Sequence, residues 1–435
     1  MADGGGHRQR RSAQTPKELS GTSPLIVIGA GASGLMAALW AAHSGREVIV
    51  LEGTVDGGRK ILISGGGRCN ILPAEVALGR FVTGSSPHAL RNILKSWPLA
   101  EQVRFFEGDL SLKLVAEAAS GKLFPARMRA REVRDALVNE ARRRGAQVRF
   151  SARVADLVRE GAAWRVRLND GDTLNASAVV LATGGRSVPT TGSDGWGFEV
   201  LARMGHTIRP TYPALVPLTA APPRHGHLAG LSLEVVLTAE GAGGHRSERG
   251  GFLFTHKGYS GPAVLNVSHV AAKPRGEGEP RGRILVNWAC RSAAEWDEDL
   301  RRGSGTVESA VARLVPARLA KTLCEEAGVP EGARLPELRR EDRRRVVGLL
   351  TRYALPWTGT EGYAKAEVTG GGVDLGDVDP RTMESRTCPG LFICGEALDA
   401  FGPIGGHNFQ WAWATGRAAG LGAARGKGQR PGSRA

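Results

Sequence analysis

Three glycines at a fixed spacing carry the clearest chemical signal in this chain. Gly29, Gly31 and Gly34 follow the apolar run LIVI and open a stretch of helical periodicity. The first glycine permits a tight strand-to-helix turn, the second lets a pyrophosphate approach the backbone, and the third lets helix and strand pack closely. Ala32 and Ser33 stand at the start of the helix, where free N–H groups attract phosphate. The spacing therefore predicts a site for the ADP part of a dinucleotide.

An acidic residue ends the second apolar run, VIVL, at the position that this type of unit requires. That residue is Glu52. Its carboxylate can accept hydrogen bonds from the adenosine ribose hydroxyls, and a 2′-phosphate there would be repelled. The sequence therefore favours FAD or NAD over NADP at this site.

A glycine-rich segment from Gly57 to Asn70 follows, and its composition predicts a loop that wraps a ligand. Arg59 could neutralise a pyrophosphate with its forked donors, although an ordinary surface arginine is the alternative. Cys69 could be a redox thiol, but a small buried filler is the favoured interpretation. The residues predicted to contact the cofactor here are Gly58, Arg59, Lys60, Ser64, Gly66, Gly67, Arg68, Cys69 and Asn70.

Two later segments have the same character of a strand that ends at glycine. The run Ala178–Thr183 stops at a glycine pair, and a second strand ends at Gly395 before an alanine-rich helix. This arrangement would bring an acid to a ribityl chain and helix N–H groups to the pyrimidine edge of a flavin. The cofactor contacts predicted there are Val154, Thr183, Gly184, Gly185, Gly395, Glu396, Asp399, Gly405, Gly406, His407 and Asn408.

Two histidines are candidate catalytic residues, because imidazole exchanges protons near neutral pH. His256 lies in the turn FTHKGYSGP, where a purely structural turn residue is the alternative. His407 opens the last helix and could tune a flavin by its charge, with simple packing as the alternative.

The elements that must position these residues indicate an α/β protein with a Rossmann-type domain made of two segments, 23–195 and 365–424. Residues 196–364 are predicted to form an inserted substrate domain, β-barrel-like over 205–300 and helical over 305–355. We expect a helix over Arg129–Arg144, then a β-meander of three short runs, QVRF, ARVADLV and WRVRLND. Residues 1–22 and 425–435 are expected to be disordered basic tails.

Composition restricts the class of protein. The chain has 435 residues, of which 41% are hydrophobic, but no apolar run long enough to cross a membrane. No secretory signal opens it, so a cytoplasmic location without membrane contact is expected.

Its five cysteines are scattered, which favours neither disulfides nor zinc. The net charge of +15 comes partly from the tails and specifies no nucleic acid partner. The expected partner is a small-molecule substrate, and the oligomeric state is not predicted.

The motifs together resemble a bacterial flavoprotein family that includes a 3-dehydro-bile-acid reductase and proteins labelled aminoacetone oxidase. The likeness runs in order over about residues 24 to 422, through segments such as GAGASGLMAALWAA, GGRKILISGGGRCN, VVLATGGRSVP, TGGGVDL and GGHNFQWAWATG. It implies FAD as cofactor, an inserted substrate domain and an oxidoreductase. The chain departs from the family pattern in two places: Leu72 and Pro73 stand where the pattern RCN-x-T-N has polar residues, and His407 replaces a usual tyrosine.

The leading hypothesis is an FAD-dependent oxidoreductase that transfers a hydride between flavin and a small organic substrate. NAD(P)H-dependent reduction of an activated C=C bond is the favoured reaction. Because a second G-x-G-x-x-G is absent from the sequence, NAD(P)H is expected to bind only transiently. The alternatives are a flavin amine oxidase and, in another class, a flavin-containing RNA-binding or regulatory protein.

Overall fold

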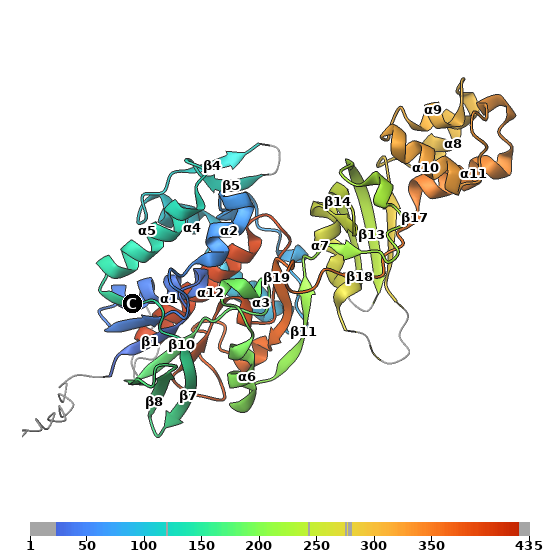
Figure 1. Cartoon of the computed structure of the whole chain (residues 1–435). Coiled ribbons are helices and arrows are strands. Elements are labelled where there is room, and N and C mark those ends of the chain that lie inside the picture. Colours follow the sequence, from blue (N-terminus) through green and yellow to red (C-terminus); the bar gives the residue numbers. More distant parts are fainter. Residues whose placement is uncertain (1–22, 119–120, 242–243, 275, 277–280, 426–435) are drawn as a thin grey trace, which may run out of the picture.

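A computed structural model of the chain describes residues 23–118, 121–241, 244–274, 276 and 281–425. The predicted disordered tails lie almost wholly outside these residues. Figure 1 shows three parts in a row: a large α/β lobe, a β-sheet with one covering helix, and a small helical unit at the far end.

A five-stranded parallel sheet forms the centre of the large lobe. Its order is β20-β10-β1-β2-β6. Its strands are β1 (Leu25–Ile28), β2 (Val48–Leu51), β6 (Ala146–Arg149), β10 (Ala178–Leu181) and β20 (Leu391–Ile393). Four of the five are fully buried, which is why they appear in the sequence as uninterrupted apolar runs.

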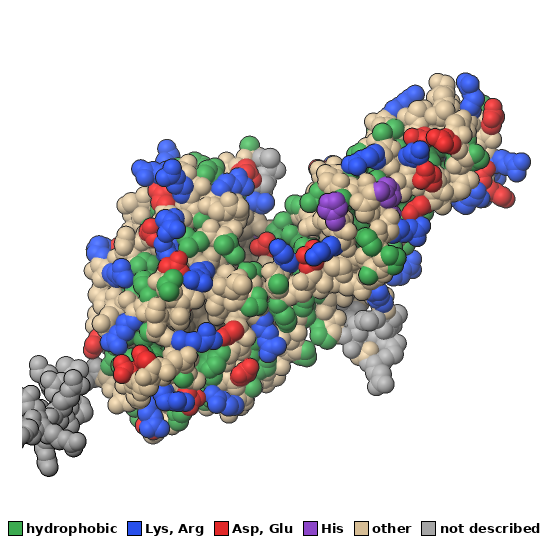
Figure 2. Space-filling model, viewed as in Figure 1, with side chains coloured by type: hydrophobic (Ala, Val, Ile, Leu, Met, Phe, Trp, Pro, Cys, Tyr) green, Lys and Arg blue, Asp and Glu red, His purple; other side chains and the backbone are tan. Residues whose placement is uncertain are grey.

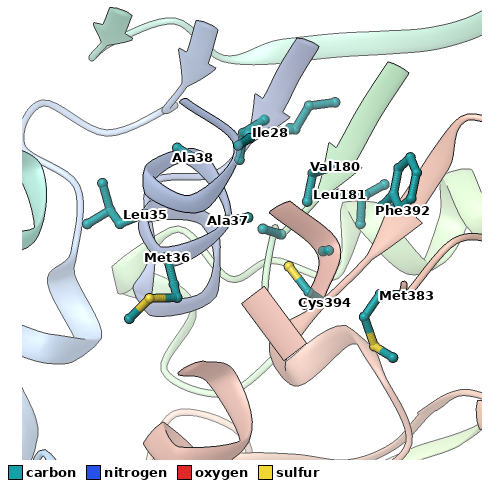
Figure 3. Close-up of a cluster of buried hydrophobic side chains, with 14 of the residues drawn as sticks. Ile28, Leu35, Met36, Ala37, Ala38, Val180, Leu181, Met383, Phe392 and Cys394 are labelled. Atoms are coloured by element: carbon teal, nitrogen blue, oxygen red, sulfur yellow. The ribbon is translucent and has the colours of Figure 1, made fainter. Parts of the chain in front are cut away.

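Two helices from opposite ends of the chain pack together on this sheet. α1 (Ala32–His43) starts after β1, and α12 (His407–Ala424) is the last helix. Small residues allow their close approach, since a Cβ on Gly420 would lie 2.3 Å from the Ala37 carbonyl oxygen. Figure 3 shows Ala37 of α1 on the side of the helix toward Val180 of β10 and Phe392 of β20, within one buried apolar cluster. The C-terminal segment therefore completes the first sheet and its helical cover.

The remaining elements of the large lobe surround this core. The helices are α2 (Arg59–Gly67), α3 (Pro87–Lys95), α4 (Leu99–Glu107), α5 (Ala130–Arg143) and α6 (Trp196–Arg203), with 3-10 turns η1 (Leu78–Arg80), η2 (Pro189–Thr191), η5 (Leu375–Asp377) and η6 (Gly395–Ala397). Two small antiparallel sheets comprise β3 (Leu72–Pro73), β5 (Lys122–Pro125) and β4 (Leu114–Glu117), and β7 (Val154–Glu160), β8 (Ala163–Leu168) and β9 (Thr173–Ala176).

The middle part is an antiparallel sheet of order β17-β16-β13-β14-β15-β12-β18. Its strands are β12 (Leu218–Thr219), β13 (Ser232–Gly241), β14 (Gly244–Thr255), β15 (Gly258–Ser260), β16 (Arg283–Asn287), β17 (Tyr353–Ala354) and β18 (Gly359–Thr360). α7 (Pro262–Ala272) covers it, and the turn η3 (Gly226–Leu228) precedes β13. The far unit holds α8 (Ala293–Arg302), α9 (Val307–Val311), η4 (Leu335–Glu337), α10 (Ala317–Glu326) and α11 (Arg340–Thr351).

A two-stranded ribbon joins the large lobe to the inserted part. β11 (Ile208–Ala214) runs antiparallel to β19 (Val368–Val373). Tyr212, Leu215, Val368 and Phe401 form a separate buried cluster there. The chain leaves and re-enters the large lobe through this ribbon, so the ribbon fixes where the insertion meets the sheet.

Three expectations from the sequence need correction. The run QVRF is β6 of the parallel sheet, so only the next two runs belong to the β7-β8-β9 sheet. The loop expected from Gly57 to Asn70 is partly helical, because Arg59 to Ile63 form α2 before Ser64, Gly65 and Gly66 leave helical geometry. The predicted boundary at residue 196 is too early, since Phe198 and Leu201 of α6 lie in the core of the parallel sheet. The helix expected from Arg129 to Arg144 is confirmed.

No helix among the described residues is both long and apolar enough to cross a membrane.

Candidate active site

A cavity of about 640 Å³ lies at the carboxyl ends of β1, β2 and β10. Ligands of open α/β sheets bind at this edge. The cavity gathers most of the residues predicted from the sequence: Gly29, Gly31, Ala32, Ser33, Glu52, Gly58, Arg59, Lys60, Ser64, Gly66, Arg68, Asn70, Val154, Thr183, Gly184, Glu396, Gly405, Gly406 and Asn408.

The three glycines of the first motif do different work in the structure. Gly29 has φ +103°, and a Cβ there would lie 2.6 Å from the Ala182 carbonyl oxygen. A Cβ on Gly34 would lie 1.9 Å from the Gly29 carbonyl oxygen. A Cβ on Gly31, by contrast, would meet no atom within 4 Å. The protein itself requires Gly29 and Gly34, whereas the space beside Gly31 is free for a ligand, which is the geometry that a pyrophosphate needs.

Glu52, the acid predicted to contact an adenosine ribose, lines the cavity at the end of β2. Its Oε2 accepts a hydrogen bond of 2.7 Å from the Ala30 N–H, and its Oε1 accepts from the Thr54 N–H and hydroxyl, both at 2.7 Å. These bonds hold the carboxylate at the end of β2, on the cavity wall. Nearby, Arg153 and Asp194 form an ion pair that also lines the cavity.

A half-buried ion pair joins α2 to the segment after β20. Lys60 Nζ lies 2.5 Å from Glu396 Oε2 and 2.6 Å from Ser187 Oγ, and Thr369 also donates to Glu396. Burial alone would raise the pKa of Glu396, but Lys60 and the hydroxyl donors outweigh it and hold the pKa below its usual range. Glu396 is therefore an anion fixed in place beside the cavity.

Arg59, the proposed pyrophosphate partner, lines the cavity while its Nε lies 3.0 Å from Asp56 Oδ1. The Asn70 side chain links the glycine-rich segment to the start of α12, because its amide oxygen accepts from the Gly406 N–H at 3.0 Å. Leu72 and Pro73, which depart from the family pattern, are buried, and the carbonyl of the preceding Ile71 accepts from Trp413 Nε1 at 3.1 Å. Backbone contacts thus hold the segment where polar side chains are usual.

Several predicted cofactor residues do not line the cavity, namely Gly34, Gly67, Cys69, Gly185, Gly395, Asp399 and His407. Asp399 instead holds a neighbouring loop by accepting from the Gly84 N–H at 2.9 Å and the Ser85 hydroxyl at 2.8 Å. Cys69 is fully buried, and burial raises the pKa of its thiol to about 12, which favours the filler over the redox thiol. None of these seven residues is therefore placed to contact a ligand in the cavity directly.

The structure does not bring His256, a predicted catalytic residue, to the cavity. His256 is exposed in the turn between β14 and β15 of the insertion and does not line the cavity. The sequence pattern located the turn, but it could not show which way the turn faces.

For His407 the structure favours the packing alternative over the electrostatic role. The side chain is buried and packs edge-on against Phe81, with ring centroids 5.9 Å apart. Burial, and secondarily the charge of Arg80, lower the pKa of His407 to about 4. Burial thus disfavours the charged ring, which supports the packing alternative.

Two buried histidines should make the protein less stable in mild acid. Burial first, and Arg80 or Arg246 second, lower the pKa of His407 and of His269 from 6.5 to about 4. Between these values the unfolded chain binds more protons than the folded one, so stability falls as the pH drops from 6.5 to 4. Each histidine should cost on the order of 3 kcal/mol at pH 4.

We expect His407→Phe to reduce this loss, measured by urea unfolding between pH 4 and 7. The exposed His256→Gln serves as the control and should leave the pH dependence unchanged. An equal loss of stability in His407→Phe and in the unmodified protein would contradict the assignment.

Sequence reasoning missed the apolar wall of the cavity. Leu215 and Leu265 come from the ribbon and α7, while Val368, Phe401 and Ile404 come from the returning chain. None belongs to a recognisable motif, and only the fold brings them together. An apolar wall beside a charged phosphate end suits a cofactor and an uncharged ring placed side by side.

Comparison with known proteins identifies the family. The model described as "HI0933-like protein Rossmann domain" matches residues 23–422, which is most of the chain. The chain belongs to this family. A ribosomal RNA dihydrouridine synthase of Escherichia coli (strain K12) is 33% identical over 403 residues, covering 90% of this chain and 95% of the relative. A 3-dehydro-bile acid delta(4,6)-reductase of Clostridium scindens is 33% identical over 407 residues, covering 92% of this chain and 98% of the relative.

A solved structure has the same fold. The 3-ketosteroid-delta4-(5alpha)-dehydrogenase of Rhodococcus jostii RHA1 matches with a TM-score of 0.50 at 15% identity, covering 95% of this chain and 99% of that chain. As the family and the parallel sheet indicate, the chain has a Rossmann-type FAD-binding domain and is an FAD-dependent oxidoreductase. The non-enzyme hypothesis is therefore abandoned.

The cavity fits FAD on the geometry described above. The carboxylate of Glu52 would hold its adenosine, the open space at Gly31 and the first turn of α1 would hold its phosphates, and the first turn of α12 would face its flavin.

Proposed function

We propose that this protein reduces a C=C bond conjugated to a carbonyl group, with FAD as hydride carrier and NAD(P)H as electron donor. One observation carries this proposal: relatives named for different substrates share that type of bond. A uracil ring has a C=C bond conjugated to a carbonyl, and so does a 3-keto bile acid with double bonds at positions 4 and 6. The two relatives that bear these names are each 33% identical to this chain.

Bound FAD would supply hydride transfer, so the chain must hold the cofactor, orient the substrate and exclude water. Gly31 and Glu52 would hold the nucleotide half of FAD. The fixed pair of Lys60 and Glu396 would contact its polar chain. Leu215, Leu265 and Phe401 would place a flat ring against the cofactor and keep water from it.

A uracil base in ribosomal RNA is the first substrate to test, ahead of a free small molecule. Two of the relatives, from Escherichia coli and Haemophilus influenzae, are named ribosomal RNA dihydrouridine synthase, the latter at 30% identity over 94% of this chain. The net charge of +15 would favour a polyanion. On the face shown in Figure 2, however, Lys and Arg side chains are interspersed with Asp and Glu over the large lobe, the middle sheet and the far helical unit. A dispersed pattern suits weak general attraction to RNA, with the base itself recognised in the cavity.

NAD(P)H would bind briefly at the flavin and leave before the substrate enters. This follows from the sequence, which has a single dinucleotide motif. The steady-state kinetics should then show parallel double-reciprocal lines, as in ping-pong reactions.

The test is anaerobic turnover of the purified FAD-loaded protein with NADH or NADPH. Three substrates are compared: unmodified ribosomal RNA transcribed in vitro, a 3-keto-4,6-diene bile acid, and aminoacetone. We expect one of the first two to gain two hydrogen atoms, detected as a mass increase of the nucleoside or the steroid. Conversion of aminoacetone in air, with neither unsaturated compound reduced, would instead establish the amine oxidase alternative and refute the proposal.

A further inference from the structure

Four carboxyl groups line the cavity, and three of them are already engaged. Glu52 accepts hydrogen bonds from Ala30 and Thr54, Asp194 pairs with Arg153, and Glu396 pairs with Lys60. The fourth is Glu367, whose side chain has no hydrogen bond or ion pair to any described residue. Within the described part of the chain, no His, Tyr or Cys lines the cavity. Glu367 is therefore the one carboxyl group of this wall that is free to act on a ligand.

Glu367 lies where the insertion meets the large lobe. It directly precedes β19, and its N–H donates to the Leu215 carbonyl oxygen at 3.2 Å. The next residue, Val368, packs in the buried cluster with Leu215 and Phe401. Glu367 therefore stands beside Leu215 and Val368 of the apolar wall.

The surroundings of Glu367 act on the acidity of its carboxyl group in two opposite directions. Glu367 is an exposed residue by its surface area, but the protein around the cavity partly desolvates its carboxyl group, which raises the pKa of Glu367 above its usual range. Lys60 acts in the opposite direction, and its ammonium is neutralised by Glu396. The other charged side chains on the cavity wall are Glu52, Arg59, Arg68, Lys122, Arg153, Asp194 and Lys365.

We propose that Glu367 donates the proton that accompanies reduction of the conjugated double bond, an inference that rests on the proposed function. The β-carbon of the substrate receives a hydride from reduced FAD, and the α-carbon receives the Glu367 carboxyl proton. The C=C bond becomes a single bond, the cofactor is left oxidised, and the carboxylate regains its proton from water. NAD(P)H then restores the reduced cofactor.

The test separates the two halves of the reaction by stopped-flow spectroscopy without oxygen. In Glu367→Gln, reduction of the flavin by NAD(P)H should keep its normal rate. Reoxidation of the reduced flavin by the substrate should slow about 100-fold or more, because a positioned general acid contributes that much. In the unmodified protein the reoxidation rate should fall as rising pH removes the proton from Glu367, and this dependence should vanish in the variant.

Glu361→Gln is the matched control, since it makes the same change six residues upstream and outside the cavity wall. Glu367→Asp, which keeps a carboxyl group, should retain the pH dependence at a reduced rate. If Glu367→Gln loses FAD, the pH dependence of Glu367→Asp decides the matter, and its absence would overturn the inference. Reoxidation of Glu367→Gln at the normal rate and with the normal pH dependence would also overturn it. Failure of the unmodified protein to reduce any conjugated bond would instead refute the proposed function.

Discussion

Gly31→Val is expected to give a folded protein that retains no FAD. The valine side chain would project into free space in the protein alone, because no atom lies within 4 Å of the Cβ position. That space is where the pyrophosphate must approach the backbone at the start of α1. We expect FAD binding at least about 100-fold weaker, which corresponds to roughly 3 kcal/mol. Flavin absorbance per protein after purification, and titration of the apoprotein with FAD, measure the effect.

The control is Gly348→Val on the exposed side of α11, where a Cβ also meets no atom within 4 Å. It should bind FAD normally. Circular dichroism of the apoprotein should be the same for Gly31→Val as for the unmodified chain. A normal flavin content in Gly31→Val would show that the cofactor lies elsewhere.

Gly420→Val is expected to destabilise the protein even without cofactor. Its Cβ would lie 2.3 Å from the Ala37 carbonyl oxygen, and backbone cannot move aside as a flexible side chain can. The two helices would have to separate, and overpacking of this kind costs about 3 kcal/mol or more. Thermal unfolding of the apoprotein should show a lower Tm, in contrast to Gly31→Val, whose loss is confined to FAD binding.

Gly348→Val again controls for the added valine in a helix. Because α12 also supplies cavity residues, FAD retention in Gly420→Val should fall as a consequence of the lost packing. An unchanged Tm of the Gly420→Val apoprotein would contradict the close contact of α1 and α12.

The central parallel sheet could be predicted from the sequence because its signals are local. Continuous apolar runs such as VIVL mark strands buried on both faces, and glycines at their ends mark turns toward a ligand. The run QVRF was misplaced because its alternating pattern is typical of an antiparallel strand, whereas β6 is an edge strand next to β2. An edge position exposes one side of a strand, and alternation alone does not reveal the direction of its neighbour.

The substrate end of the site could not be predicted, for physical reasons. Leu215, Leu265 and Phe401 are ordinary core residues until the ribbon and α7 bring them to one wall. The two histidines were selected by the chemistry of imidazole, but that chemistry depends on surroundings. Burial disfavours the charged form of His407, and the turn places His256 away from the cavity. No motif marks Glu367 in the sequence, and only the fold brings its carboxyl group to the cavity wall.

The most direct test of the account uses the reduced, FAD-loaded protein in the absence of oxygen. The flavin is reduced photochemically, so that no nicotinamide is present, and is then mixed with unmodified ribosomal RNA or with the 3-keto-4,6-diene bile acid. If reduced FAD passes its hydride to a conjugated C=C bond, the absorbance of oxidised flavin should return, and one C=C bond should be reduced for each flavin reoxidised. A flavin that stays reduced with both compounds, but is reoxidised at once by air, would contradict this hydride transfer.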